Sequence, residues 1–192
     1  MWALAILFLG VGLASGLKAE EVIRNGDFSS DDNVWRRAGK IVYLDASGKV
    51  VDKGTEGSKP AFQLDLTPNR WTVAEQTFRN RDKSKSITIT VRLRASADFA
   101  RNDAAEYSDV NFQAGGTYFW SAIVYPKVDF FVRLADATHN YGLINLTPGG
   151  DWQTLKLRLN DLSPTQKERT LFLNAAPGTG TIYIESVSAV SP

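Results

Sequence analysis

The sequence predicts an all-β fold, a two-sheet antiparallel β-sandwich of about eight strands. The first observation is residues 87–94, which alternate apolar and polar side chains without a break, as a half-buried strand does. The second is that shorter alternating runs follow, separated by clusters of Gly, Pro, Asn and Asp, the residues that favour turns. The third is that no long stretch after Val22 has helical periodicity. Together these patterns favour strands throughout.

The alternating runs give each predicted strand an inward and an outward side. Residues 87–94 direct their odd-numbered side chains to a core and their even-numbered ones, Thr88 to Arg94, away from it. Residues 128–134 place Val128, Phe130, Val132 and Leu134 inward and Asp129, Phe131 and Arg133 outward. Alternation continues in residues 155–159, 171–173 and 182–184. The intervening turns are expected at residues 115–116, 148–150 and 177–180.

Residues 1–19 are predicted to be a secretory signal peptide and residues 20–192 one β-sandwich domain. Residues 2–16 are apolar and uncharged, and this run is shorter than the ~20 residues that a membrane-spanning helix needs. An uncleaved membrane anchor is the alternative. Export without any cysteine indicates a bacterial periplasmic or secreted protein that depends on core packing, with no membrane contact after signal cleavage.

Composition excludes several classes of function. With 22 basic and 21 acidic side chains the net charge is +1, which argues against nucleic-acid binding. The absence of cysteine excludes zinc–thiolate sites and thiol nucleophiles, and a single histidine leaves no multi-histidine metal site.

The two ends of the predicted domain carry a resemblance. Residues 23–28 read IRNGDF and are followed by Trp35, while residues 152–155 read WQTL and residues 178–188 read GTGTIYIESVS. This pairing resembles carbohydrate-binding modules of the family 4/9 type, which have a galactose-binding-like jelly-roll fold. The resemblance covers essentially all of residues 20–192. It implies a jelly-roll sandwich that binds glycans, works with glycoside hydrolases and often holds one structural calcium ion.

The resemblance implies Asp27 and Glu185 as candidate calcium ligands. The acid that normally follows the opening Phe is replaced by Ser29, and the aspartate of the closing strand by Glu185. Calcium requires several oxygen ligands with negative charge among them. The sequence therefore leaves open whether this protein binds calcium.

Sugar recognition requires flat apolar faces flanked by fixed hydrogen-bonding groups. Phe131 stands at an outward position between Asp129 and Arg133, and Arg92 and Arg94 join the same face if their strand lies nearby. The further candidates are aromatic residues at strand starts or near loops: Trp71, Trp120 and Tyr141. The alternative is that Phe131 packs beneath a loop and the charges form a solvated face.

We therefore expect an exported protein that binds a polysaccharide or oligosaccharide without catalysis, with a glycoside hydrolase or another exported protein as partner. One alternative is a structural or protein-interaction sandwich, favoured if Phe131, Trp71 and Trp120 all lie in the core. Another is a polysaccharide lyase, favoured if His139 lines a cleft with Arg133 and Tyr141. A glycoside hydrolase would need two facing carboxylates. The usual lyase signatures and a G-x-S-x-G motif are absent, so the sequence predicts no enzyme.

Overall fold

The computed structural model of the chain describes residues 20–32, 34–79, 85–105, 108–112, 120–124, 127–135 and 140–191. For residues 108–112 and 120–124 it describes the backbone. None of the described residues forms a helix. The described part of the chain therefore contains no helix that could cross a membrane. The prediction of an all-β chain is confirmed.

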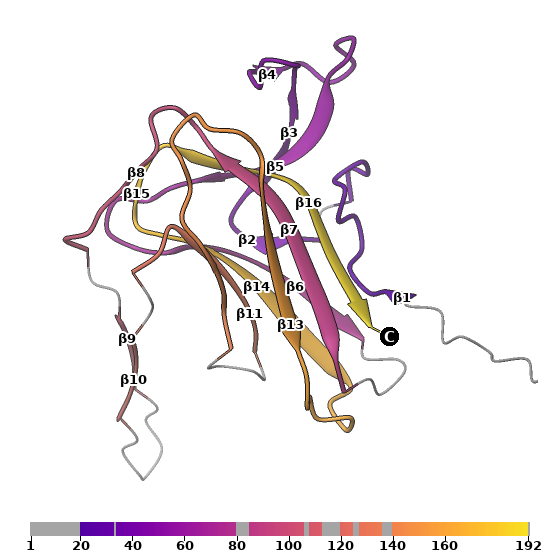
Figure 1. Cartoon of the computed structure of the whole chain (residues 1–192), viewed down its shortest axis with the longest axis vertical. Helices are drawn as coiled ribbons and strands as arrows, with labels where there is room; N and C mark the ends of the chain where they lie inside the picture. Colours follow the sequence, from indigo (N-terminus) through magenta and orange to yellow (C-terminus); the bar gives the residue numbers. More distant parts are fainter. Residues whose placement is uncertain are drawn as a thin grey trace, which may run out of the picture.

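Two antiparallel sheets form the body of the molecule (Figure 1). The larger sheet has the order β13-β7-β16-β5-β3-β4, with β1 beside β16. Its strands are β1 (Glu20–Glu21), β3 (Lys40–Leu44), β4 (Val50–Val51), β5 (Lys59–Asp65), β7 (Ile87–Ala95), β13 (Gln153–Leu159) and β16 (Thr181–Ser191). The smaller sheet has the order β12-β11-β14-β6-β2. Its strands are β2 (Arg36–Arg37), β6 (Thr72–Arg79), β11 (Phe130–Leu134), β12 (Gly142–Ile144) and β14 (Glu168–Ala175).

The core lies between the two sheets and follows the predicted alternation. On β7, Ile89, Val91 and Leu93 are fully buried, while Arg92 is exposed. Phe130, Val132 and Leu134 of β11 face them from the other sheet and belong to the same apolar cluster. The predicted sandwich is therefore confirmed.

The opening motif contributes to this core. Phe28 stacks on Phe62 of β5 with ring centroids 5.2 Å apart, and Trp35 lies 5.8 Å from the same ring. Offset and tilted aromatic contacts at these distances add to the burial energy of the rings. The N-terminal segment is thus packed against the larger sheet.

The closing strand β16 lies at the centre of the larger sheet and contains a β-bulge. Ile184 pairs with Leu93, and Ser186, not Glu185, pairs with the next residue of β7, Arg92. A bulge adds one residue to one strand of a pair. As a result Ile184 and Val187 both face the core although three positions separate them.

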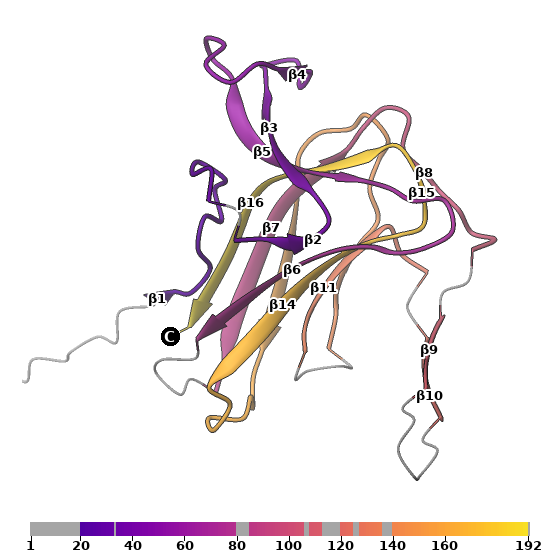
Figure 2. The same cartoon turned by 180° about the vertical axis from the view of Figure 1, so that it is seen from behind.

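A separate hairpin extends away from the sandwich in both views (Figures 1 and 2). It consists of β9 (Ser108–Phe112) and β10 (Trp120–Val124), which pair with each other. Above it, β8 (Ala100–Arg101) pairs with β15 (Gly178–Thr179). This short pair connects the segment before the hairpin to the start of the closing strand.

Candidate functional site

The outer face of the five-stranded sheet brings several predicted residues together. Phe131 of β11 pairs with Leu143 of β12 and with Asn174 of β14. Arg133 lies opposite Phe172 of β14, which in turn lies opposite Glu75 of β6. Directly opposed residues of an antiparallel pair share a face, so these side chains form two rows across the sheet. We call this surface the five-stranded face.

Phe131 has the predicted phase, but its expected exposure is wrong, because the side chain is fully buried. The rings of Trp71 and Tyr141 contact it edge-on, with centroids 5.0 and 5.3 Å away, and Val128 joins the same cluster. Strand phase determines the face on which a side chain lies, but not what covers it. The first part of the alternative, that Phe131 packs beneath a loop, is confirmed, because Trp71 and Tyr141 lie outside the strands. The second part, a solvated charged face, is wrong for Asp129, which is buried. Trp71 and Tyr141 are half-buried and form the accessible part of the cluster.

The predicted phase also fails at residues 128 and 129, because β11 begins only at Phe130. Val128 was expected in the core but packs with Phe131 on the outer side. Asp129 was expected to face solvent but is 7% exposed. Its Oδ2 accepts the Leu146 N–H at 2.7 Å, and its Oδ1 accepts from Arg101 Nη1 at 3.0 Å. Asp129 thus ties β8 to the loop after β12.

Arg133 lies over Phe172, with its guanidinium carbon 4.3 Å from the ring centroid. Its Nε is buried and has no hydrogen-bond partner. Arg37 approaches the same ring at 5.9 Å and pairs through Nε with Glu75 Oε2 at 2.7 Å. Phe172, Arg37 and Glu75 were not predicted from the sequence. Phe172 was detectable, since it stands at the outward phase between Leu171 and Leu173.

Arg92 and Arg94 do not join the five-stranded face, so that expectation is wrong. They lie on β7 in the other sheet, and β7 pairs with β13 and β16. Arg94 lies between the rings of Trp152 and Tyr183, at 4.8 and 5.8 Å, and its Nη2 donates to Gly48 O at 2.8 Å. Arg92 forms an ion pair with Glu185. An alternating pattern does not reveal which sheet a strand joins.

The surroundings of Arg94 form a second small apolar cluster. Val42, Leu44 and Ala61 are buried on the outer side of β3 and β5 and pack against Trp152 and Tyr183. Burial raises the pKa of the Tyr183 hydroxyl, with a further contribution from Asp65. These contacts fill the space beneath the β3–β4 loop.

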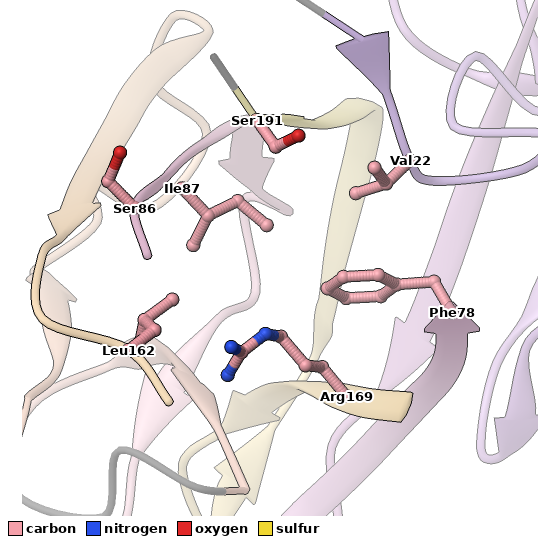
Figure 3. Close-up of a pocket in the computed structure, with 7 residues that line it drawn as sticks. All are labelled: Val22, Phe78, Ser86, Ile87, Leu162, Arg169 and Ser191. Carbon is pink, nitrogen blue, oxygen red and sulfur yellow. The ribbon is translucent and has the colours of Figure 1, made fainter. Parts of the chain in front are cut away.

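The hollows of the described surface lie away from the cluster of Trp71, Phe131 and Tyr141. A cavity of about 10 Å³ at one end of the sandwich has room for roughly one water molecule. In it the Arg169 side chain lies between Phe78 and Leu162 (Figure 3), donates to Ser163 O at 2.7 Å and has a pKa lowered by burial. A groove of about 640 Å³ lies beside the end of β6 that does not pair with β2. The small cavity is too small for a sugar.

Two predicted residues fall wholly or partly outside the described part. For Trp120 the structure describes the backbone, which pairs with Phe112 in the β9–β10 hairpin. The side chain of Trp120 is outside the described part. His139 lies outside the described residues, so the grouping with Arg133 and Tyr141 that would favour a lyase stays untested.

The two candidate calcium ligands, Asp27 and Glu185, both interact with other side chains. Asp27 Oδ1 accepts from both the N–H and the hydroxyl of Ser29, which lowers the pKa of this carboxyl. Glu185 is paired with Arg92. Within the described residues no three acidic or histidine side chains gather as a metal site would require. Asp27 and Glu185 as they stand do not fit a calcium site, and the ion stays a prediction of the sequence.

Comparisons with known proteins yield structural neighbours only. No family model and no curated protein matches this sequence. Among solved structures, the TmCBM61 module in complex with β-1,4-galactotriose aligns with 90% of this chain and 99% of its own length, at 10% identity and a TM-score of 0.49. The CBM22-1 xylan-binding domain of Paenibacillus barcinonensis Xyn10C aligns with 89% and 94%, at 10% identity and a TM-score of 0.47.

A third neighbour is much longer than this chain. It is the enzymatically active domain of tailspike protein 4 from bacteriophage CBA120, at 12% identity and a TM-score of 0.48. The alignment covers 88% of this chain but 21% of that domain. Likenesses at this level identify no family, so membership of family 4/9 stays a prediction.

Proposed function

We propose that this protein binds a polysaccharide or oligosaccharide on the five-stranded face and does not transform it. The proposal rests on one observation: Trp71, Phe131, Arg133 and Tyr141, four of the residues predicted from sequence, converge there. Trp71 and Tyr141 offer half-buried rings for the C–H face of a sugar. Arg133 stands beside them as a half-buried hydrogen-bonding group.

The face is held in place before any ligand arrives. Phe131 supports both rings from below, and β11 and β14 are paired over their whole common length. A preformed site avoids the entropy cost of ordering loops on binding. Single sugar sites of this kind are weak, so we infer that a repetitive polymer, or a partner such as a glycoside hydrolase, supplies avidity.

The absence of catalysis is part of the proposal. Glycoside hydrolysis requires two carboxylates on either side of the bond that is cleaved. Of the carboxylates on this face, Glu75 is already paired with Arg37 at 2.7 Å. The predicted signal peptide supports an exported protein, secreted or periplasmic.

Affinity electrophoresis against a panel of soluble polysaccharides tests the proposal. We expect retardation by at least one polymer and about tenfold weaker binding or more in Trp71→Ala, since a buried aromatic face contributes about 1.5–3 kcal/mol. Tyr43→Ala is the matched control, because Tyr43 is a half-buried ring on β3 in the other sheet. A folded protein that no polysaccharide retards would contradict the proposal.

A protein-interaction role is the second candidate, because of two observations on the same face. Phe131 is fully buried, and Leu143 beside it is 48% exposed, one of two large apolar side chains exposed to this degree in the described part. Such a surface suits a protein contact. This role gains if no glycan binds and Leu143→Asp, which leaves the core untouched, abolishes association with an exported partner.

A further inference from the structure

The five-stranded face carries an excess of positive charge. Arg36 lies directly opposite Glu75, and Arg79 directly opposite Glu168. Within the described strands, the charged residues of this face are Arg36, Arg37, Arg79 and Arg133 against Glu75 and Glu168. The whole chain is nearly neutral at +1. The excess therefore belongs to this face and is not an average property of the surface.

Arg133 differs from the other arginines that contact aromatic rings. Arg37 is paired with Glu75, and Arg94 donates to Gly48 O. Arg133 stacks on Phe172, its Nε is buried without a hydrogen-bond partner, and no carboxylate of the described residues pairs with it. An unsatisfied buried donor on a charged group is costly. The Nε itself is out of a ligand's reach, so an acceptor supplied by a ligand would bind at the Nη1 and Nη2 donors of this half-buried side chain.

We propose that the five-stranded face selects anionic polysaccharides, whose carboxylate or sulfate groups Arg133 receives. This inference rests on the proposed function and names the class of ligand. A guanidinium stacked on a ring keeps the N–H groups in its plane available, and their fork matches both anions. Glu75 does not repel the anion strongly, because Arg37 neutralises it.

The aromatic rings would bind the sugar ring, and the Arg133 guanidinium would bind its acidic substituent. Tyr141 immediately precedes β12, whose Gly142 pairs with Val132, the residue before Arg133. The half-buried Tyr141 ring is therefore placed next to Arg133 across the sheet edge. A sugar lying on Tyr141 or Trp71 would direct a substituent toward the guanidinium. A neutral glycan would contact the same rings but would offer the Arg133 guanidinium only uncharged hydroxyl groups as hydrogen-bond acceptors.

Calorimetric titration with three oligosaccharides of equal length tests the proposal: a uronate oligomer, a sulfated galactose oligomer and a neutral galactose oligomer. We expect at least one acidic oligomer to bind tenfold or more tightly than the neutral one at low salt. The difference should shrink as salt is added. The two acidic arms show whether carboxylate or sulfate is the preferred anion.

The variants separate a specific site from general charge attraction. We expect Arg133→Gln to remove the preference for the acidic oligomer, and Arg133→Lys, which keeps the charge but loses the fork, to retain part of it. Arg158→Gln is the matched control, because Arg158 is an exposed arginine on β13 of the other sheet. Thermal unfolding of each variant identifies any that fails to fold, in which case Arg133→Lys decides.

Each other outcome overturns the inference. Equal affinity for acidic and neutral oligomers contradicts the selectivity while leaving glycan binding intact. Equal losses in Arg133→Gln and Arg158→Gln indicate attraction by net charge alone. If none of the three oligomers and none of the wider polysaccharide panel binds, the proposed function fails together with this inference.

Discussion

At the scale of single residues, Gly48 and Arg94 depend on each other. Gly48 has a φ of +83°, and a Cβ built on it would lie 1.6 Å from Arg94 Nη2. That close approach lets the guanidinium donate to Gly48 O while it lies between Trp152 and Tyr183. The β3–β4 loop is held over the larger sheet by this contact.

Gly48→Ala should therefore destabilise the protein more than strain alone explains. We expect a loss of about 2–4 kcal/mol in the free energy of unfolding, from the positive φ and the lost hydrogen bond to a charged group. Gly54→Ala is the control, since Gly54 has a φ of +92° but open space around it, and should cost about 1–2 kcal/mol. Urea unfolding measures both. Equal losses would show that the Arg94 contact contributes nothing.

Gln76 connects the N-terminal segment to β6 from inside the sandwich. It is 1% exposed. Its Oε1 accepts the Arg24 N–H at 2.8 Å, and its Nε2 donates to Arg24 O at 3.0 Å. The side chain therefore satisfies both backbone groups of one residue, as a neighbouring strand would.

Gln76→Leu should leave both Arg24 backbone groups without a partner. We expect a loss of about 1–3 kcal/mol, because two hydrogen bonds of about 0.5–1.5 kcal/mol each are lost, and because Arg24 is exposed, so that water replaces part of them. Gln63→Leu serves for comparison, since Gln63 is half-buried on the outside of β5 and donates to Asp65. It should cost less than about 1 kcal/mol. If denaturant melts of the two variants coincide, the bridging role of Gln76 is wrong.

At the scale of elements, the alternation of residues 87–94 and 130–134 was enough to predict strands and their buried sides. The same patterns did not show that β7 and β11 belong to different sheets. Pairing depends on partners far along the chain, whereas phase is local. For this reason the sequence correctly predicted Trp71, Arg133 and Tyr141 for the five-stranded face. Arg92 and Arg94 were wrongly assigned to it. The burial of Phe131 was not predicted.

The bulge in β16 makes a prediction about deletions. Removing Glu185 places Ser186 next to Ile184, so that Ile184, Val187 and Ala189 keep their inward phase in a regular strand. We expect this variant to fold, with a loss below about 2 kcal/mol that includes the exposed Arg92–Glu185 pair. Its melting curve should stay cooperative.

Deletion of Thr90 from the neighbouring β7 is the contrasting case. It turns Val91 and Leu93, both fully buried, outward and directs Arg92 and Arg94 into the core. Each lost apolar burial costs about 1.5–3 kcal/mol, and the buried arginines add to it, against a total stability of about 5–15 kcal/mol. We expect no cooperative unfolding. A folded Thr90 deletion, or an unfolded Glu185 deletion, would contradict the proposed register.

At the scale of the whole molecule, the two outer surfaces of the sandwich have different uses. On the larger sheet, the space around Arg94 is filled by Val42, Leu44 and Ala61 and closed by the β3–β4 loop. On the smaller sheet, the half-buried rings and Arg133 keep polar and aromatic groups available. This asymmetry favours the smaller sheet over the larger one as the place of the proposed binding.

The β9–β10 hairpin should be dispensable for the sandwich. Among the strands that the structure describes, β9 and β10 pair only with each other, and a lone two-stranded hairpin contributes little stability. The residues that flank it contact each other, since Lys127 O accepts from Arg101 Nη1 and Lys127 Nζ donates to Asp103 O, both at 3.5 Å. A short Gly-Ser-Gly linker can therefore replace residues 106–126. We expect the melting temperature to change by no more than about 4 °C, as for a loss below about 1 kcal/mol.

The same deletion tests whether Trp120 takes part in glycan binding. Trp120 is the one predicted binding residue on this hairpin. If the ligand lies on Trp71, Tyr141 and Arg133, its affinity should be unchanged in the shortened protein. A folded deletion variant that has lost glycan binding would instead assign the hairpin to the site, since the five-stranded face would still be intact. Loss of cooperative unfolding would show that the hairpin packs on the sandwich, contrary to the pairing of its strands.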